Sequence, residues 1–150
     1  MTLKNFFLFI PDLDSKSGLG HYFRCLKFLE FFKKKYRTYI LIKKNKTSVN
    51  LLSKTKYNKI IFFNNLESII KRFSNKENFF FIDSYDKKKI DLINHLTKNT
   101  ISTADNLVKL NTKYIVDHTF LRNKKDHERK NPDSIIYSNY LFFPFNNKKE

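Results

Sequence analysis

Short apolar runs alternate with amphipathic segments along most of this chain, and no other feature restricts its fold as much. The first run, residues 5–10, is closed by Pro11 and Asp12. A continuous apolar run of this length is typical of a strand buried on both faces of a parallel sheet. A helix is expected to begin near Gly20, because apolar residues then recur at helical spacing among lysines: Tyr22, Cys25, Leu26, Leu29 and Phe32.

The same alternation continues towards the C-terminus. It predicts further strands at residues 37–42, 60–63, 79–82, 100–103, 114–116 and 134–137. It predicts helices at residues 66–73 and 87–98, a weak helix at 49–53, and a charged loop at 124–132. Strands that alternate with helices indicate βαβ units, so we expect an α/β fold with a Rossmann-like parallel sheet flanked by helices. One domain is expected over residues 1–145, followed by a polar tail at 146–150.

Hydrophobic residues make up 41% of the 150 residues, enough to predict a folded core. We expect eight of the aromatic side chains in that core, namely Phe28, Phe31, Phe32, Phe62, Phe63 and Phe79 to Phe81. The single cysteine, Cys25, excludes an intramolecular disulfide and a zinc site built from several cysteines. It lies on the apolar side of the predicted helix, which favours a buried, inert thiol.

The net charge of +16 bears on the partners of the chain. So basic a sequence raises the possibility of a nucleic-acid or anionic-membrane partner. However, most of the 30 basic residues are Lys, whereas bidentate contacts to bases and phosphates favour Arg. Lys, Asn, Ile and Phe are abundant and Ala104 is the only alanine, as an AT-rich coding sequence would produce. We interpret the lysines as a solvated, compositionally biased surface and expect no nucleic-acid partner.

Nothing near the N-terminus resembles a secretory signal, because the apolar run at residues 6–10 is short and leads into Pro11 and Asp12. No apolar run reaches the length of a transmembrane helix. The sequence therefore predicts a cytoplasmic protein without membrane attachment.

Three polar clusters follow predicted strands, at residues 12–21, at residues 83–85 and at Asp105-Asn106. Open parallel sheets bind ligands beyond the carboxyl ends of their strands, so these clusters are candidate binding segments. Asp83 has two possible roles, either orienting a water or sugar hydroxyl or capping the following helix. Tyr85 is either a stacking platform or a packing residue.

The segment Gly18-Leu19-Gly20-His21 contains both glycines of the chain. It lacks the third glycine of a dinucleotide fingerprint and the Gly-Lys-Ser/Thr of a P-loop. It does place a helix N-terminus, which attracts anionic or oxygen-rich ligands, directly before His21. The helix dipole there favours a neutral imidazole that can act as a general base. The alternative is a surface histidine that caps the helix.

The other three histidines are weaker candidates for a functional site. His95 is expected to be exposed on a helix, and His118 and His127 to lie in loops without a partner at metal-ligand spacing. We expect no metal site and no cofactor.

Several segments resemble the UDP-sugar hydrolases of pseudaminic acid biosynthesis. The closest match is the N-terminal motif formed by Asp12-Leu13-Asp14-Ser15, Gly18-x-Gly20-His21 and Arg24-Cys25-Leu26. Residues 81–85 are similar to that family's Asp-x-Tyr segment. Weaker similarities lie in residues 104–107, where Asn106 replaces the second Asp of the family, and in residues 140–145.

This resemblance implies the N-terminal half of a GT-B fold, with the sugar nucleotide bound between two Rossmann-like domains. It implies hydrolysis of UDP-2,4-diacetamido-2,4,6-trideoxy-β-L-altropyranose to UDP and the free sugar, with His21 as the general base. The implied substrate-binding residues are Asp14, Ser15, Gly18, Gly20, Arg24, Asp83, Tyr85 and Asp105.

The family's second domain, which binds most of the UDP, has no counterpart in these residues. A split enzyme with a separate nucleotide-binding partner, a short version and an interrupted gene product are all consistent with this. The contrasting hypothesis is a non-catalytic remnant, or a module that binds a carbohydrate or a protein partner.

Overall fold

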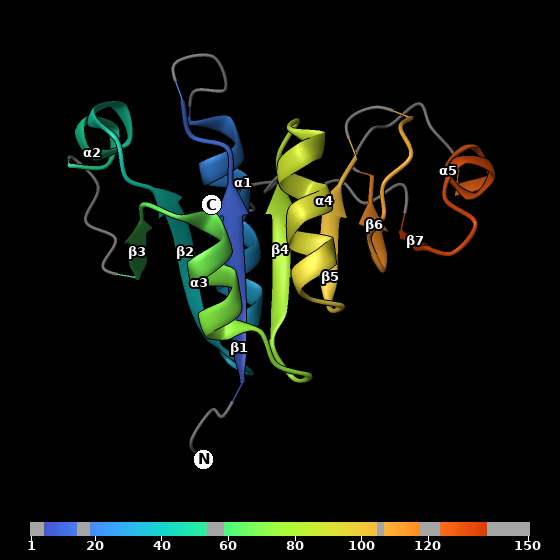
Figure 1. The fold of residues 1–150 in the computed structure, drawn as a ribbon, viewed down its shortest axis with the longest axis horizontal. Helices are drawn as coiled ribbons and strands as arrows, with labels where there is room; N and C mark the ends of the chain where they lie inside the picture. Colours follow the sequence, from blue (N-terminus) through green and yellow to red (C-terminus); the bar gives the residue numbers. More distant parts are fainter. Residues whose placement is uncertain (1–4, 15–18, 54–58, 105–106, 118–123, 138–150) are drawn as a thin grey trace, which may run out of the picture.

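The computed structural model describes residues 5–14, 19–53, 59–104, 107–117 and 124–137. The ribbon in Figure 1 shows strands in the middle, with helices packed over them. The elements are β1 (Phe6–Pro11), α1 (Gly20–Phe32), β2 (Arg37–Lys43), α2 (Lys46–Leu52), β3 (Ile60–Phe63), α3 (Leu66–Phe73), β4 (Phe79–Asp83), α4 (Lys87–Leu96), β5 (Thr100–Thr103), β6 (Tyr114–Val116), α5 (Lys124–Lys130) and β7 (Ile135–Tyr137).

The strands form one seven-stranded sheet in the order β3-β2-β1-β4-β5-β6-β7, and every pairing is parallel. The predicted α/β fold with a Rossmann-like parallel sheet is therefore confirmed. The chain builds outward from β1 to β3, then returns to place β4 on the other side of β1. The strand order thus reverses between β1 and β4, and such a switch point is where open α/β sheets bind ligands.

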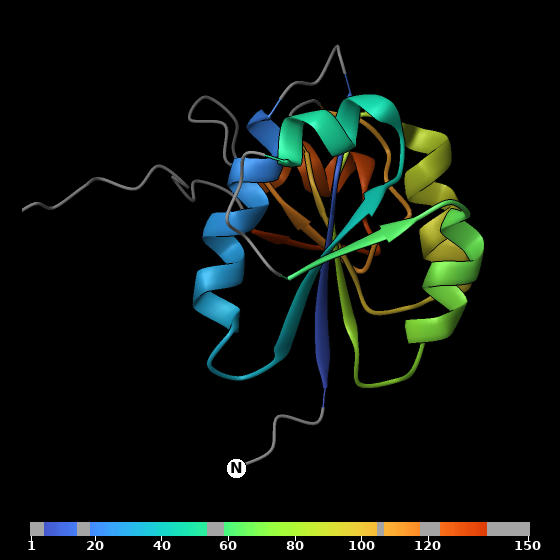
Figure 2. The same cartoon turned by 90° about the vertical axis from the view of Figure 1, so that its left-hand side faces the viewer.

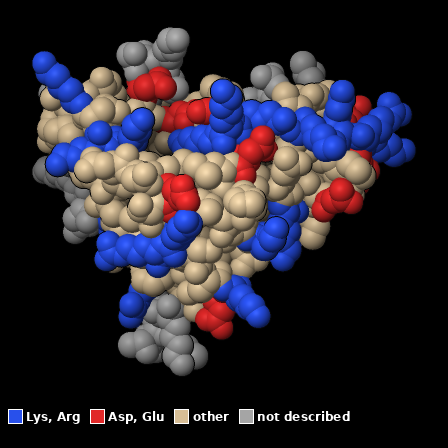
Figure 3. Space-filling view, in the orientation of Figure 1, with Lys and Arg blue, Asp and Glu red and all other residues tan. Residues whose placement is uncertain are grey.

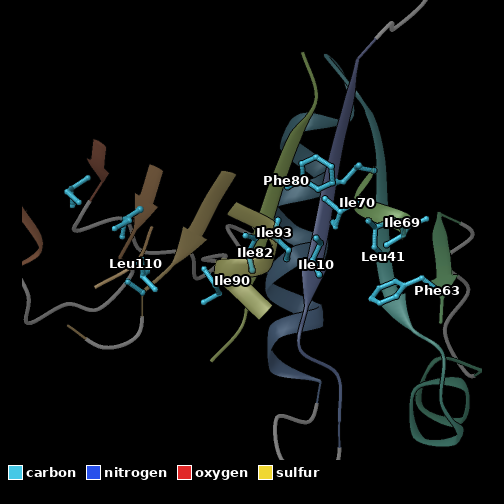
Figure 4. Close-up of a cluster of buried hydrophobic side chains, with 14 residues drawn as sticks. Ile10, Leu41, Phe63, Ile69, Ile70, Phe80, Ile82, Ile90, Ile93 and Leu110 are labelled. Carbon is cyan, nitrogen blue, oxygen red and sulfur yellow. The ribbon is translucent and has the colours of Figure 1, made fainter. Parts of the chain in front are cut away.

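The core lies on both faces of the sheet, which explains the continuous apolar runs. In β1, Phe7 and Phe9 face one side while Leu8 and Ile10 face the other, and all four are buried. The helix α1 covers the first face, and α3 and α4 cover the second, as Figure 2 shows from the side. Figure 4 shows the second face, where side chains of α3 and α4 pack against β1, β2 and β4.

Among the helices whose preceding residue the structure describes, α2, α3 and α4 begin with a side-chain cap. Asn45 and Ser48 form a reciprocal capping box at α2, which is longer and starts earlier than the weak helix predicted at residues 49–53. Asn65 caps α3 through the backbone N–H of Ser68, and Asp86 caps α4. Each cap satisfies backbone donors that the first helical turn leaves unpaired.

The structure contradicts one predicted loop and part of the predicted aromatic core. Residues 124–132, predicted to be a charged loop, contain α5, in which His127 is the one buried residue. Because no apolar stripe marks this helix, hydrophobic periodicity gives no signal for it. Phe31 and Phe62 are not in the core: Phe31 is 82% exposed on the outer side of α1, and Phe62 is 41% exposed on the edge strand β3.

Lysine and arginine side chains spread over the face of the molecule seen in Figure 3, with acidic side chains among them. Many of them lie along the upper part of this view, where α4 and α5 begin with lysines. In the part of the chain that the structure describes, no helix is long and apolar enough to cross a membrane.

Candidate active site

The segments that follow β1 and β4 are joined at the switch point of the sheet. Pro11 and Asp83 are register partners at the ends of these two strands, and the backbone N–H of Asp12 donates to the carbonyl of Asp83 at 2.8 Å. The first two polar clusters predicted from the sequence therefore lie next to each other. The third, Asp105-Asn106, lies outside the described residues.

His21 lies in the first turn of α1, with only 4% of its surface exposed. Its Nδ1 is 2.6 Å from Oδ1 of Asp83. The alternative of a surface histidine that caps the helix is therefore wrong. Because a carboxylate oxygen can only accept, this contact requires the proton on Nδ1, and a neutral ring then has its acceptor at Nε2. A histidine that accepts a proton at Nε2 as a general base needs this tautomer.

Asp83 is fully buried and is held by side-chain donors of three residues from two elements, α1 and β5. Besides His21, Thr103 Oγ1 donates to Oδ1 at 2.8 Å, and Arg24 donates to both oxygens, from Nε to Oδ2 and from Nη2 to Oδ1, at 2.5 Å each. Burial raises the pKa of Asp83, but the hydrogen bonds from His21 and Arg24 outweigh it and leave that pKa below its ordinary value. Asp83 does not cap α4, since Asp86 does.

Asp12 fixes the loop that carries Tyr85. Its Oδ2 accepts from the hydroxyl of Ser84 at 2.8 Å and from the backbone N–H of Tyr85 at 2.9 Å, and its Oδ1 accepts from Lys89 Nζ at 2.8 Å. The Tyr85 ring meets the His21 ring edge-on, with 4.6 Å between the centroids. Since Tyr85 is 63% exposed, much of its surface is open to solvent.

The remaining predicted residues divide into two groups. Gly20 is the first residue of α1, and a Cβ atom there would meet no atom within 4 Å. Asp14 is exposed, and it is the last described residue of the loop that follows β1. Ser15, Gly18 and Asp105 lie outside the described residues. The structure thus brings together four of the predicted residues: His21, Arg24, Asp83 and Tyr85.

A second buried His–Asp pair was not predicted. His127 Nε2 on α5 contacts Oδ2 of Asp117, the residue after β6, and both side chains are fully buried. The expectation that His127 lies in a loop is therefore wrong. Ten residues separate the two, so no short motif connects them. Because both are closed off from solvent, this pair holds α5 against the sheet and offers no surface for catalysis.

No group of three potential metal ligands occurs among the described residues. The arrangement around His21 is suited to proton transfer without a metal: an oriented imidazole, an ionised Asp that fixes its tautomer, and an exposed aromatic ring beside it. Two ion pairs, Arg24–Asp83 and Lys89–Asp12, balance the charges around it. In comparisons with known proteins, no family model matches the chain and no curated protein matches its sequence.

Proposed function

We propose that this chain is the N-terminal, water-side half of a UDP-sugar hydrolase of pseudaminic or related nonulosonic acid biosynthesis. The substrate in this proposal is UDP-2,4-diacetamido-2,4,6-trideoxy-β-L-altropyranose. The observation that carries it is the hydrogen bond between His21 Nδ1 and Asp83 Oδ1. It links two segments on which the resemblance rests, 62 positions apart, and gives His21 the tautomer of a general base.

In the proposed reaction, Nε2 of His21 accepts a proton from a water molecule as its oxygen attacks the anomeric carbon. The bond between that carbon and the β-phosphate oxygen breaks, and UDP leaves with the electron pair. Proton transfer of this kind contributes about 10²–10⁴ to the rate in enzymes. The exposed ring of Tyr85 would lie along the sugar.

The charge at this edge of the sheet supports an anionic substrate. The helix α4 begins with three lysines, which only Asp86 separates from Tyr85. A positive rim raises the local concentration of an anion such as a nucleotide diphosphate sugar. In this proposal most of the contacts to UDP come from a second, nucleotide-binding domain, supplied by a partner chain.

The test is hydrolysis in water enriched in ¹⁸O. The purified chain is mixed with the C-terminal, nucleotide-binding half of a full-length family member and the UDP-sugar. UDP is measured by chromatography and the ¹⁸O content of both products by mass spectrometry. Each half alone serves as the control. We expect UDP to form only when both halves are present, with the label in the free sugar.

Label in UDP would mean that water attacks phosphorus, and would refute the role proposed for His21. Absence of hydrolysis, with chemical-shift changes at Tyr85 when the free sugar is added, would instead support a non-catalytic carbohydrate-binding module. Absence of both would support a remnant or a module that binds a protein partner.

A further inference from the structure

A cavity of about 480 Å³ lies at the edge of the sheet opposite to His21. Its walls are the end of α4, the segment before β6 and the turn between α5 and β7, which lead into the amino ends of β5, β6 and β7. β1 and β4 point upward in Figure 1, so this is the lower edge, whereas the candidate active site lies where these two strands end. The volume is within the range of about 300–1,000 Å³ that is typical of small-molecule sites. The cavity is therefore large enough for a ligand and separate from the candidate active site.

Side-chain hydrogen bonds join the walls of this cavity. The amide of Asn131 accepts from the backbone N–H of Leu110 at 2.6 Å and donates to the carbonyl of Val108 at 3.0 Å. The hydroxyl of Ser134 donates to the carbonyl of Thr112 at 2.6 Å. The segment before β6 is thus tied to the turn before β7, and the cavity is preformed.

Two buried side chains of the lining have polar atoms without a partner. Asn94, near the end of α4, is 7% exposed, and neither its Oδ1 nor its Nδ2 has a hydrogen-bond partner among the described residues. The same holds for the hydroxyl of Thr112, which is 3% exposed. Buried polar groups are rarely left unpaired, because losing hydration without a partner is unfavourable. Since the Asn94 amide has no hydrogen bond to lose, it can turn toward a molecule in the cavity.

The charges of the lining favour an anion. Lys98, Lys109 and Lys113 are exposed, and none of them forms an ion pair with a described residue. Lys113 lies over the ring of Tyr114, 5.2 Å from its centroid. Asp133 is the one acidic residue of the lining, all of which the structure describes. An excess of positive charge attracts anions, and lysine binds phosphate as a point charge.

We propose that this cavity binds a phosphorylated sugar or polyol of monosaccharide size. Its phosphate lies at the three lysines, and its hydroxyls pair with Asn94 and Thr112. A hydroxyl both donates and accepts, so hydroxyls can satisfy Oδ1 and Nδ2 of the amide together. Ordered water alone is the competing occupant. The proposal goes beyond the hydrolase function and does not depend on it, because the two sites lie at opposite edges of the sheet.

The test is a titration of the full ¹⁵N-labelled chain with ribose 5-phosphate, ribose and inorganic phosphate, followed by NMR. Ribose lacks the anionic group and inorganic phosphate lacks the sugar hydroxyls. The side-chain amide signals of Asn94 are assigned by their loss in Asn94→Leu. We expect ribose 5-phosphate to shift these signals and the backbone N–H signal of Thr112. Its Kd should be about 1 mM or lower, and at least about tenfold below that of either other probe.

Two variants separate the amide from the charge. Asn94→Leu removes the amide at similar volume and should raise the Kd for ribose 5-phosphate at least about tenfold. Because the amide has no partner to lose, the urea midpoint of this variant should be no lower than that of the wild type. Lys113→Gln should raise the Kd for ribose 5-phosphate and for inorganic phosphate. Lys34→Gln, which changes an exposed lysine after α1, is the matched control and should leave both unchanged.

Absence of any shift at Asn94 and Thr112 with ribose 5-phosphate would overturn the proposal and leave ordered water as the occupant. Inorganic phosphate that binds as tightly as ribose 5-phosphate would also overturn it, since it would indicate an adventitious ion only. So would an Asn94→Leu protein with the wild-type Kd, or one with a clearly lower urea midpoint, because the latter would mean that the amide has a stabilising partner. None of these outcomes depends on UDP release, so this proposal and the proposed function can fail separately.

Discussion

Replacing Asp83 by Asn should destabilise the protein by about 3 kcal/mol. The carboxylate is fully buried and accepts four hydrogen bonds, three of them at 2.5–2.6 Å from His21 and Arg24. An Asn offers one acceptor oxygen, and its NH₂ group would face a donor of Arg24 or His21. Removing one partner of a buried ion pair costs about 3–5 kcal/mol. We take the lower end because the Arg24 side chain is 16% exposed and can regain some hydration.

Urea denaturation followed by far-UV circular dichroism at neutral pH gives the free energy of unfolding. Asp91→Asn is the matched control, because Asp91 on α4 forms an exposed ion pair with Lys87 and its loss should cost less than about 1 kcal/mol. An Asp83→Asn protein within about 1 kcal/mol of the wild type, with an unchanged slope, would refute the assignment of a buried ion pair.

The wild type and Asp83→Asn should also differ in how their free energy of unfolding depends on pH. The pKa of Asp83 is lower in the folded protein than its ordinary value of 3.8, so the folded state favours the ionised carboxylate. This contribution to stability is complete above the ordinary value and is lost as the pH falls through the lowered, folded-state pKa. The difference in unfolding free energy between wild type and Asp83→Asn should therefore be constant near neutrality and shrink in acid. A difference that grows on acidification would contradict the sign of the shift.

Two further predictions concern buried groups away from His21. His127→Ala should lower the free energy of unfolding by about 3 kcal/mol, because it leaves the carboxylate of Asp117 buried without this partner. His95→Ala, at an exposed histidine, is the control. Equal urea midpoints for His127→Ala and His95→Ala would refute this prediction. The Cys25 thiol should react with a disulfide reagent only after unfolding, because burial raises its pKa and hides the sulfur. Rapid reaction in the native protein would contradict this.

The sheet is predictable from the sequence because its strands are buried on both faces. The runs at residues 60–63 and 100–103 coincide with β3 and β5. The fold class also places the carboxyl ends of β1 and β4 together, so the proximity of His21 and Asp83 follows from the fold. What hydrophobic patterning cannot reveal is a helix whose one buried side chain is polar, as His127 is in α5.

Patterning also fails to assign the individual aromatic residues. Phe31 is as apolar as Phe28, but its side chain is largely exposed whereas Phe28 packs against the core, so residue type alone places it wrongly. The partnership of Arg24 with Asp83 was missed although a signal exists. His21 and Arg24 are three residues apart on a helix and therefore share one face, which is the face that meets Asp83.

The central claim, that His21 is the general base of a UDP-sugar hydrolase, is tested most directly by the turnover number for UDP release. It should be measured for the wild-type chain and for His21→Ala, each with the nucleotide-binding half present and with His95→Ala as the matched control. We predict that His21→Ala lowers the turnover number at least about 100-fold, while His95→Ala leaves it unchanged. A His21→Ala protein that releases UDP at the wild-type rate would contradict the claim.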